Sequence, residues 1–223
     1  MTGGAPLVIF DCDGVLVDSE PIAMAVLLET IRAQGLEIDP AQGYELFLGR
    51  SLASVGQMLA EDFGVKLDPL ALEEMRQRLY ARFRAELKPT PRTPEVLAAL
   101  TAPFCVASSS QPERVELSLR LTGLWEHFDG KLFSATMVSH GKPAPDLFLL
   151  AAERMGYDPA NSLVVEDSAA GIRAAQAARM RVAGYTGGGH ARNTEHEARL
   201  RALDPDWIIG DMRELPRLLR HWQ

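Results

Sequence analysis

The stretch "VIFDCDGVLVDSE" at residues 8–20 places three aspartates in a segment whose start is apolar and typical of a buried strand. A carboxylate is costly to remove from water unless it has a partner, so aspartates at this position need a chemical reason. The polar residues elsewhere in the chain show whether other side chains converge on the same place.

Apolar runs of strand length recur along the chain and alternate with longer helical patterns. Most of these runs are apolar nearly throughout, as in strands that are buried on both faces of a parallel sheet. The alternation predicts an α/β fold with a doubly wound parallel sheet. The expected strands are residues 7–10, 104–108, 131–135, 162–166, 181–185 and 206–210, and the expected helices between them are residues 111–121, 145–155, 168–179 and 214–221.

One interval, from about residue 20 to residue 99, contains amphipathic segments and no strand pattern. It predicts a helical cap domain inserted after the first strand. The proline-rich stretch "KPTPRTPE" forms its C-terminal border, where Thr93 is expected to cap a helix that begins at Pro94. We expect an α/β core domain formed by residues 1–18 and 90–223 and a helical cap domain formed by residues 19–89.

The composition excludes several classes of protein. A chain of 223 residues, 47% of them hydrophobic and 24% charged, is typical of a globular protein with a substantial core. A net charge of −7 without runs of like charge argues against a nucleic-acid surface. No stretch resembles a signal peptide or a membrane span, and Cys12 and Cys105 lie in apolar runs that do not suggest disulfides. We expect a cytoplasmic protein with no nucleic-acid or membrane partner, as a monomer or weak homodimer.

Polar side chains gather at the ends of the expected strands. Ligands of open parallel sheets bind beyond the carboxyl ends of the strands, near the point where the winding reverses. Four acids and two hydroxyls would therefore line one edge of the sheet. They are Asp11 and Asp13 after the first strand, Ser108 and Ser109 at the end of the second, and Glu166 and Asp167 at the end of the fourth.

This edge needs positive charge. Carboxylates at such short range repel each other, so a bound divalent cation is the simplest reason to gather them. Oxygen donors without histidine or thiolate select a hard ion, and Mg²⁺ fits best. Lys142, flanked by Pro143 and Pro145, follows the third strand and adds a fixed cation. A cation beside carboxylates and a metal suggests an anionic ligand, most simply a phosphoryl group.

Four motifs identify a family. "DCDGVLVDSE", "ASSS", "GKPAPD" and "VVEDSAAG", in that order, resemble the signature motifs of the haloacid dehalogenase-like superfamily, in its helical-cap branch. That branch includes phosphosugar phosphatases and β-phosphoglucomutase. One motif alone is weak, but four in order with a helical insertion between the first and second are specific. The resemblance covers residues 7–185.

The resemblance implies a reaction and the residues that perform it. Asp11 would be the nucleophile that forms an aspartyl-phosphate, and Asp13 the general acid and base. Ser108, with Ser109 beside it, and Lys142 would hold the phosphoryl group that is transferred. The partner would be a small phosphorylated metabolite.

The same resemblance implies a metal site. Mg²⁺ would be coordinated by Asp11, the backbone carbonyl of Asp13 and Asp167, while Glu166 would be a direct ligand or a partner through water. Dehalogenases of the superfamily do not use the second aspartate or a metal, so these residues favour phosphoryl transfer.

The choice between phosphatase and mutase depends on cations in the helical insertion. In β-phosphoglucomutase a histidine follows the first motif, and a lysine and an arginine of the cap grip a second phosphate. Ala23, Leu48 and Leu52 occupy those positions here. We expect a phosphatase of a sugar phosphate or sugar-acid phosphate, with a sugar phosphomutase as alternative and a non-catalytic metal-binding regulator as second alternative. Arg50, in the same loop, is expected to contact the carboxylate or hydroxyl-rich end of the substrate.

Other polar residues have structural interpretations. Asp18 and Ser19 are expected to cap the helix that follows the first motif, and Ser168 a later helix. His140 and His190 are interpreted as solvated loop residues, the second within the flexible glycine-rich loop "TGGGH".

Overall fold

A computed structural model of the chain describes residues 5–48, 52–191, 194–220 and 222. It contains two compact units, one formed by Met1–Asp18 with Lys88–Gln223 and the other by Ser19–Leu87. Arg50 lies outside the described residues, so its role stays a prediction.

The larger unit is built on a six-stranded parallel sheet with the order β3-β2-β1-β4-β5-β6. The α/β fold with a doubly wound parallel sheet is therefore confirmed, and the six expected strands are all present. The third and sixth are one residue shorter at each end than expected. The strands are β1 (Leu7–Phe10), β2 (Phe104–Ser108), β3 (Leu132–Ser134), β4 (Ser162–Glu166), β5 (Arg181–Tyr185) and β6 (Trp207–Ile209).

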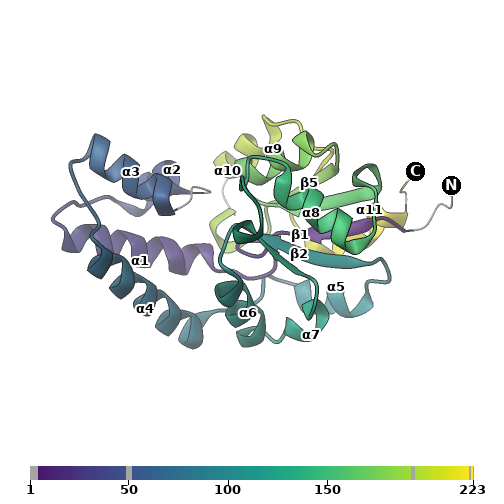
Figure 1. Cartoon of the computed structure of the whole chain (residues 1–223), viewed down its shortest axis with the longest axis horizontal. Coiled ribbons are helices and arrows are strands. Elements are labelled where there is room, and N and C mark those ends of the chain that lie inside the picture. Colours follow the sequence, from purple (N-terminus) through teal and green to yellow (C-terminus); the bar gives the residue numbers. More distant parts are fainter. Residues whose placement is uncertain (1–4, 49–51, 192–193, 221, 223) are drawn as a thin grey trace. The chain divides into compact units, whose positions relative to one another are not determined.

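Helices cover both faces of this sheet. Helices α8 (Asp146–Met155) and α9 (Ala169–Ala177) lie on one face, and α6 (Pro112–Leu121) and α7 (Trp125–Phe128) lie on the other (Figure 1). The alternation of side chains along β1 explains why both layers are needed, because Leu7 and Ile9 belong to the core on the side of α8 and α9. Phe10 instead meets the rings of Phe104 and Phe128 edge-on, with centroid distances of 6.0 and 6.3 Å.

The remaining helices of this unit are α5 (Thr93–Ala99), α10 (Thr194–Arg201) and α11 (Leu215–Arg220). Helix α5 begins at Thr93 rather than at Pro94. Helix α7 is not among the predicted helices, because it is too short to show a period. Helix α10 is not among them either, because it is largely polar; it carries two ion pairs between residues four positions apart, Arg199–Glu195 and Arg201–Glu197.

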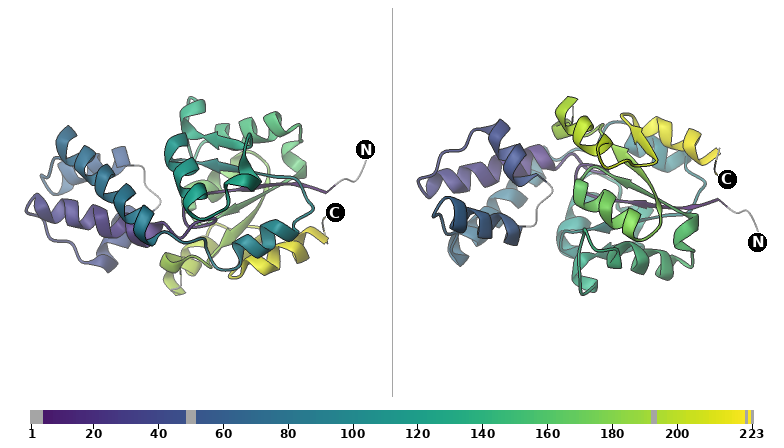
Figure 2. Two further views of the ribbon diagram at one scale, coloured as in Figure 1. Left: turned by 90° about the horizontal axis from the view of Figure 1, so that it is seen from below. Right: turned by 90° about the horizontal axis from the view of Figure 1, so that it is seen from above.

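The strand order places the polar residues of β1 and β4 side by side. The chain starts at β1 inside the sheet, moves outward through β2 and β3, and returns to β4 on the other side of β1 (Figure 2). Phe10 is paired with Val165, and the backbone N–H of Asp11 donates to the carbonyl of Val165 at 3.0 Å. Asp11, directly after β1, and Glu166, the last residue of β4, therefore lie together at the point where the winding reverses.

The smaller unit is helical in its described residues. A core of apolar side chains that includes Met24, Ile31, Phe47 and Leu59 joins its helices. Across the described part of the chain, no helix combines the length and apolar character that crossing a bilayer requires. The described residues of the smaller unit form the helices α1 (Glu20–Ala33), α2 (Pro40–Phe47), α3 (Leu52–Asp62) and α4 (Pro69–Glu86).

The start of α1 differs from the expectation. Ser19 occupies the N-cap position, but its side chain makes no capping hydrogen bond. A capping side chain accepts from the second or third backbone N–H of the helix, and Pro21 removes one of these donors. Asp18 does not cap either, because its carboxylate accepts from the backbone N–H of Gly189 at 2.8 Å. The expected cap by Ser168 is present on α9.

Candidate active site

Asp11 lies buried at the carboxyl end of β1. Its Oδ1 accepts a hydrogen bond from Lys142 Nζ at 2.6 Å. Burial raises the pKa of the Asp11 carboxyl well above its usual range, the ammonium of Lys142 opposes this, and the acids Glu166 and Asp167 add to it. The aspartate that the sequence places after β1 is therefore a carboxylate in need of positive charge.

Lys142 connects two carboxylates. Its ammonium also donates to Glu166 Oε1 at 2.6 Å and to the backbone carbonyl of Ala107 at 3.1 Å. Burial disfavours the charged ammonium, but Asp11 and Glu166 outweigh it and raise the pKa of Lys142 above its ordinary value. The lysine is thus a fixed cation, with a side chain only 3% exposed.

Three carboxylates could hold a metal. Asp11, Glu166 and Asp167 are buried and offer ligand oxygens that all lie within 4.8 Å of one another. Burial also raises the pKa of the Asp167 carboxyl, so added positive charge would stabilise the ionised forms of both aspartates. A buried set of oxygen donors fits a hard divalent cation such as Mg²⁺.

Glu166 already has protein partners on both oxygens. Besides the contact of Oε1 with Lys142, its Oε2 accepts from the backbone N–H and the hydroxyl of Ser168, at 2.8 and 2.9 Å. The side chain of Glu166 therefore fixes the lysine and the first turn of α9 together.

Asp13 has different surroundings from Asp11. Its Oδ2 accepts from the hydroxyl of Ser110 at 2.7 Å, and its Oδ1 from Arg114 Nη2 at 2.9 Å. Neither partner is among the site residues that the sequence predicts. Ser110 is the last serine of the "ASSS" motif. Arg114 lies in the first turn of α6, the helix that starts just beyond this edge of the sheet.

Ser108 and Ser109, the two serines that the sequence predicts at the site, differ in burial and in contacts. Ser108 is buried at the end of β2, and its Oγ accepts from the backbone N–H of Ser110 at 3.0 Å. Ser109 is exposed, and it is the next residue, Ser110, that reaches Asp13.

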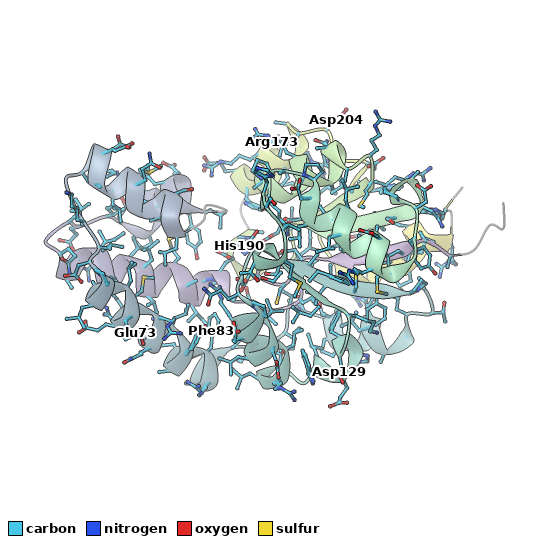
Figure 3. All side chains as sticks on the ribbon, viewed as in Figure 1. Glu73, Phe83, Asp129, Arg173, His190 and Asp204 are labelled. Atoms are coloured by element: carbon cyan, nitrogen blue, oxygen red, sulfur yellow. The ribbon has the colours of Figure 1, made fainter. Side chains whose placement is uncertain are left out.

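His190 was interpreted as a solvated residue of a flexible loop, and this is wrong. Its side chain is fully buried, and its Nε2 lies 2.9 Å from Asp167 Oδ2. Figure 3 shows His190 within the α/β unit, whereas Asp129 and Asp204 project from the surface of that unit. His140 is exposed, as expected. The position of His190 after the fifth strand places it at the same edge as the acids, but nothing local in the sequence indicates that its side chain is buried there.

Comparisons with known proteins agree with this site. A family model for haloacid dehalogenase-like hydrolases matches residues 5–179. The chain is 31% identical to 6-phosphogluconate phosphatase of Escherichia coli (strain K12), over 85% of this chain and 86% of that protein. It is 34% identical to fructose-1-phosphate phosphatase of the same organism, over 77% of this chain and 92% of that protein.

A solved structure shows the same fold over nearly the whole length. It is a conserved haloacid dehalogenase-like protein of unknown function from Agrobacterium tumefaciens strain C58, which is 34% identical with a TM-score of 0.87. The match covers 97% of this chain and 98% of that chain. From the family match, the curated relatives and this structure together, the chain belongs to the haloacid dehalogenase-like hydrolase family.

Proposed function

We propose that this chain is a Mg²⁺-dependent phosphatase that hydrolyses a small phosphorylated metabolite, a sugar phosphate or sugar-acid phosphate, through an aspartyl-phosphate on Asp11. The observation that carries the proposal is the buried Asp11 carboxylate, 2.6 Å from Lys142 and grouped with Glu166 and Asp167. The names of the two Escherichia coli relatives, both phosphatases of phosphorylated sugar compounds, support the substrate class.

In the first half-reaction, a carboxylate oxygen of Asp11 attacks the phosphorus atom of the substrate. The new O–P bond forms as the bond from phosphorus to the substrate oxygen breaks, and the electron pair stays on that oxygen. Asp13, in its protonated form, gives this oxygen a proton so that the alcohol leaves neutral. The product of this step is the phosphorylated Asp11.

In the second half-reaction, Asp13 is the general base. Its carboxylate takes a proton from water while the water oxygen attacks phosphorus, and the bond to Asp11 breaks. Inorganic phosphate leaves, and Asp11 returns as a carboxylate. Asp13 needs a fixed position for both proton transfers, and we assign Ser110 and Arg114 to that task on the basis of their contacts with its two oxygens.

The surrounding residues hold the phosphoryl group and its charge. Lys142 balances negative charge on the phosphoryl oxygens, and Ser108 can donate a hydrogen bond to one of them. Asp11, the Asp13 carbonyl and Asp167 would hold Mg²⁺, which would supply further positive charge near the phosphoryl group. We assign Glu166 mainly to holding Lys142, with any contact to the metal through water, because both its oxygens already accept from protein donors.

The test compares the wild-type chain with Asp11→Asn in the hydrolysis of p-nitrophenyl phosphate, with and without Mg²⁺. We expect turnover that depends on Mg²⁺ and falls by at least about 10³-fold in the variant, which keeps the size of the side chain and loses the nucleophile. No turnover by the wild-type chain would favour the non-catalytic regulator.

The substrate class needs a second experiment. A panel that contains 6-phosphogluconate, fructose 1-phosphate and other phosphosugars should give release of phosphate with higher kcat/KM than p-nitrophenyl phosphate. The panel should also contain β-glucose 1-phosphate with its bisphosphate. If glucose 6-phosphate forms faster than phosphate is released, the mutase is the correct function.

A further inference from the structure

The glycine-rich loop of residues 186–191 is held in the α/β unit by hydrogen bonds to two other segments. Its first residue, Thr186, donates its backbone N–H to the carbonyl of Ile209 at 2.9 Å. Gly189 donates to the carboxylate of Asp18 at 2.8 Å, across a long separation in sequence. The loop is thus anchored both to the strand beside it and to Asp18, and His190 directly follows the second anchor, which restricts its position.

Two glycines leave the space that the imidazole of His190 occupies. A β-carbon added at Gly188 would come within 2.9 Å of His190 Cε1 and 2.7 Å of the carbonyl oxygen of Gly14. A β-carbon added at Gly14 would overlap Asp167 Oδ2 and come within 2.9 Å of the same imidazole carbon. The ring, the turn that carries Asp13 and the carboxylate of Asp167 therefore pack at van der Waals distance.

A second histidine supports the first. His196 lies on α10, is 5% exposed, and meets the ring of His190 edge-on with a centroid distance of 5.2 Å. It also makes a hydrogen bond to the backbone of Asp167. Asp167 is therefore contacted by His190 at its carboxylate and by His196 at its main chain.

The contact with His190 occupies one oxygen of Asp167. An ionised carboxylate only accepts hydrogen bonds, so the Nε2 atom that lies 2.9 Å from Oδ2 carries the hydrogen in this contact. The other oxygen, Oδ1, can then serve as a ligand in the carboxylate cluster. Partners of this kind in other metal sites orient the ligand, and their loss costs about 10- to 100-fold in metal affinity.

We propose that His190 is a positioning residue for Asp167, which it holds by one carboxylate oxygen so that the other is presented to the divalent cation. This inference rests on the proposed function, because it uses Asp167 as a metal ligand. His190 has no assigned contact with the substrate or the reacting atoms, and it acts through Asp167.

The experiment measures metal binding without turnover. Binding of Mn²⁺ to the full-length chain is followed by the electron paramagnetic resonance signal of free Mn²⁺, in the absence of substrate. The variants are His190→Leu, which removes the N–H; His190→Gln, whose amide can reach the place of Nε2; and His140→Gln, a matched change of an exposed histidine.

We expect the Kd for Mn²⁺ to rise about 10- to 100-fold in His190→Leu. His190→Gln should stay within a few-fold of wild type, and His140→Gln should equal wild type. A wild-type Kd in His190→Leu overturns the inference. If His190→Leu does not fold, His190→Asn replaces it, because its shorter amide does not reach Asp167; equal Kd values for His190→Asn and His190→Gln then overturn the inference.

Asp167→Asn separates this inference from the proposed function. If Asp167→Asn weakens Mn²⁺ binding and the His190 variants do not, only the positioning role is wrong. If Asp167→Asn binds Mn²⁺ as the wild type does, the metal assignment of the proposed function fails, and the role of His190 fails with it.

Discussion

Ion pairs at the carboxyl edge of the sheet and ion pairs on the outer surface of α4 have the same geometry and opposite surroundings. Lys142 Nζ lies 2.6 Å from Asp11 Oδ1, with side chains 3% and 9% exposed. Arg76 Nη2 lies 2.7 Å from Glu73 Oε2, with side chains 55% and 43% exposed. The two distances are nearly equal, so distance does not distinguish a functional ion pair from a solvated one. Burial does, because it determines how much the pair contributes to stability and how firmly its side chains are held.

The largest expected effect is at Lys142. Lys142→Met leaves Asp11 and Glu166 buried without their shared cation, so we expect the free energy of unfolding to fall by roughly 3–5 kcal/mol. Urea denaturation at pH 8 in the presence of EDTA measures this. Lys66→Met, at an exposed position, is the control and should denature like the wild type. A loss at Lys142 no larger than at Lys66 would remove the distinction between the two regions.

The deficit of Lys142→Met should depend on pH. The pKa of the Asp11 carboxyl is raised in the folded state, so lowering the pH protonates it in the folded chain before the unfolded chain. Without the lysine the pKa of Asp11 in the folded chain rises further, because the ammonium that favours the ionised carboxylate is missing. The variant should therefore approach the stability of the wild type as the pH is lowered from 8. A deficit that does not change as the pH is lowered would contradict the electrostatic explanation.

The next effect concerns Arg114, whose ion pair with Asp13 is partly buried. In Arg114→Gln, we expect kcat/KM for a phosphosugar to fall roughly 10- to 100-fold, because Asp13 is misplaced for proton transfer to the leaving alcohol. The loss for p-nitrophenyl phosphate should be smaller, since p-nitrophenolate leaves without a proton. Arg120→Gln, on the exposed side of the same helix, should leave both rates unchanged. Equal losses for the two substrates in Arg114→Gln would argue against a role in proton transfer.

A smaller effect is expected at Asp211, a capping residue with a side chain 35% exposed. Its carboxylate accepts from the backbone N–H of Arg213, and Asp211→Ala should cost about 1 kcal/mol at pH 7. Hydrogen bonds from Arg213 lower the pKa of Asp211 to about 2, from an ordinary value of 3.8. The stabilisation by the charged cap is thus fully present above pH 3.8 and is lost as the pH falls through about 2. The midpoints of thermal denaturation of the variant and the wild type should therefore converge in acid. A gap at pH 2 as large as the gap at pH 7 would show that packing, rather than the charged cap, is responsible.

The smallest effect is expected for Arg76→Gln, which removes the exposed pair with Glu73. Solvent and salt screen such a pair, so the midpoint of urea denaturation and the phosphatase rate should both match the wild type. A clear loss of stability would mean that surface pairs on α4 contribute more than their exposure suggests.

Much of the sheet edge could be predicted from sequence because local patterns encode it. The apolar run before Asp11 and the one that ends at Glu166 specify parallel strands, and the rule that ligands bind at the carboxyl ends brings these acids and Lys142 together. The structure adds the distances and the order of the strands. It also shows that Asp11 and Asp13, two positions apart, have different partners.

His190 and Arg114 could not be identified in the same way. The composition of "TGGGH" resembles a flexible loop, and the burial of its histidine depends on Gly14, Gly188 and Asp18, which are near it only in the folded chain. Arg114 lies on a helix with several other charged residues, and nothing in their spacing distinguishes the one that meets Asp13. Contacts between distant segments decide both cases, and a single sequence does not encode them as a local pattern.

The most direct test of the central claim is to find the phosphoryl group on the enzyme. The chain is mixed with an excess of the best phosphosugar and Mg²⁺, quenched in acid within the first turnover, and digested for mass spectrometry. We predict a peptide heavier by one phosphoryl group, with the modification on Asp11 and absent from Asp11→Asn. A phosphoryl group on another residue, or phosphate release by the Asp11→Asn variant at the wild-type rate, would contradict the account.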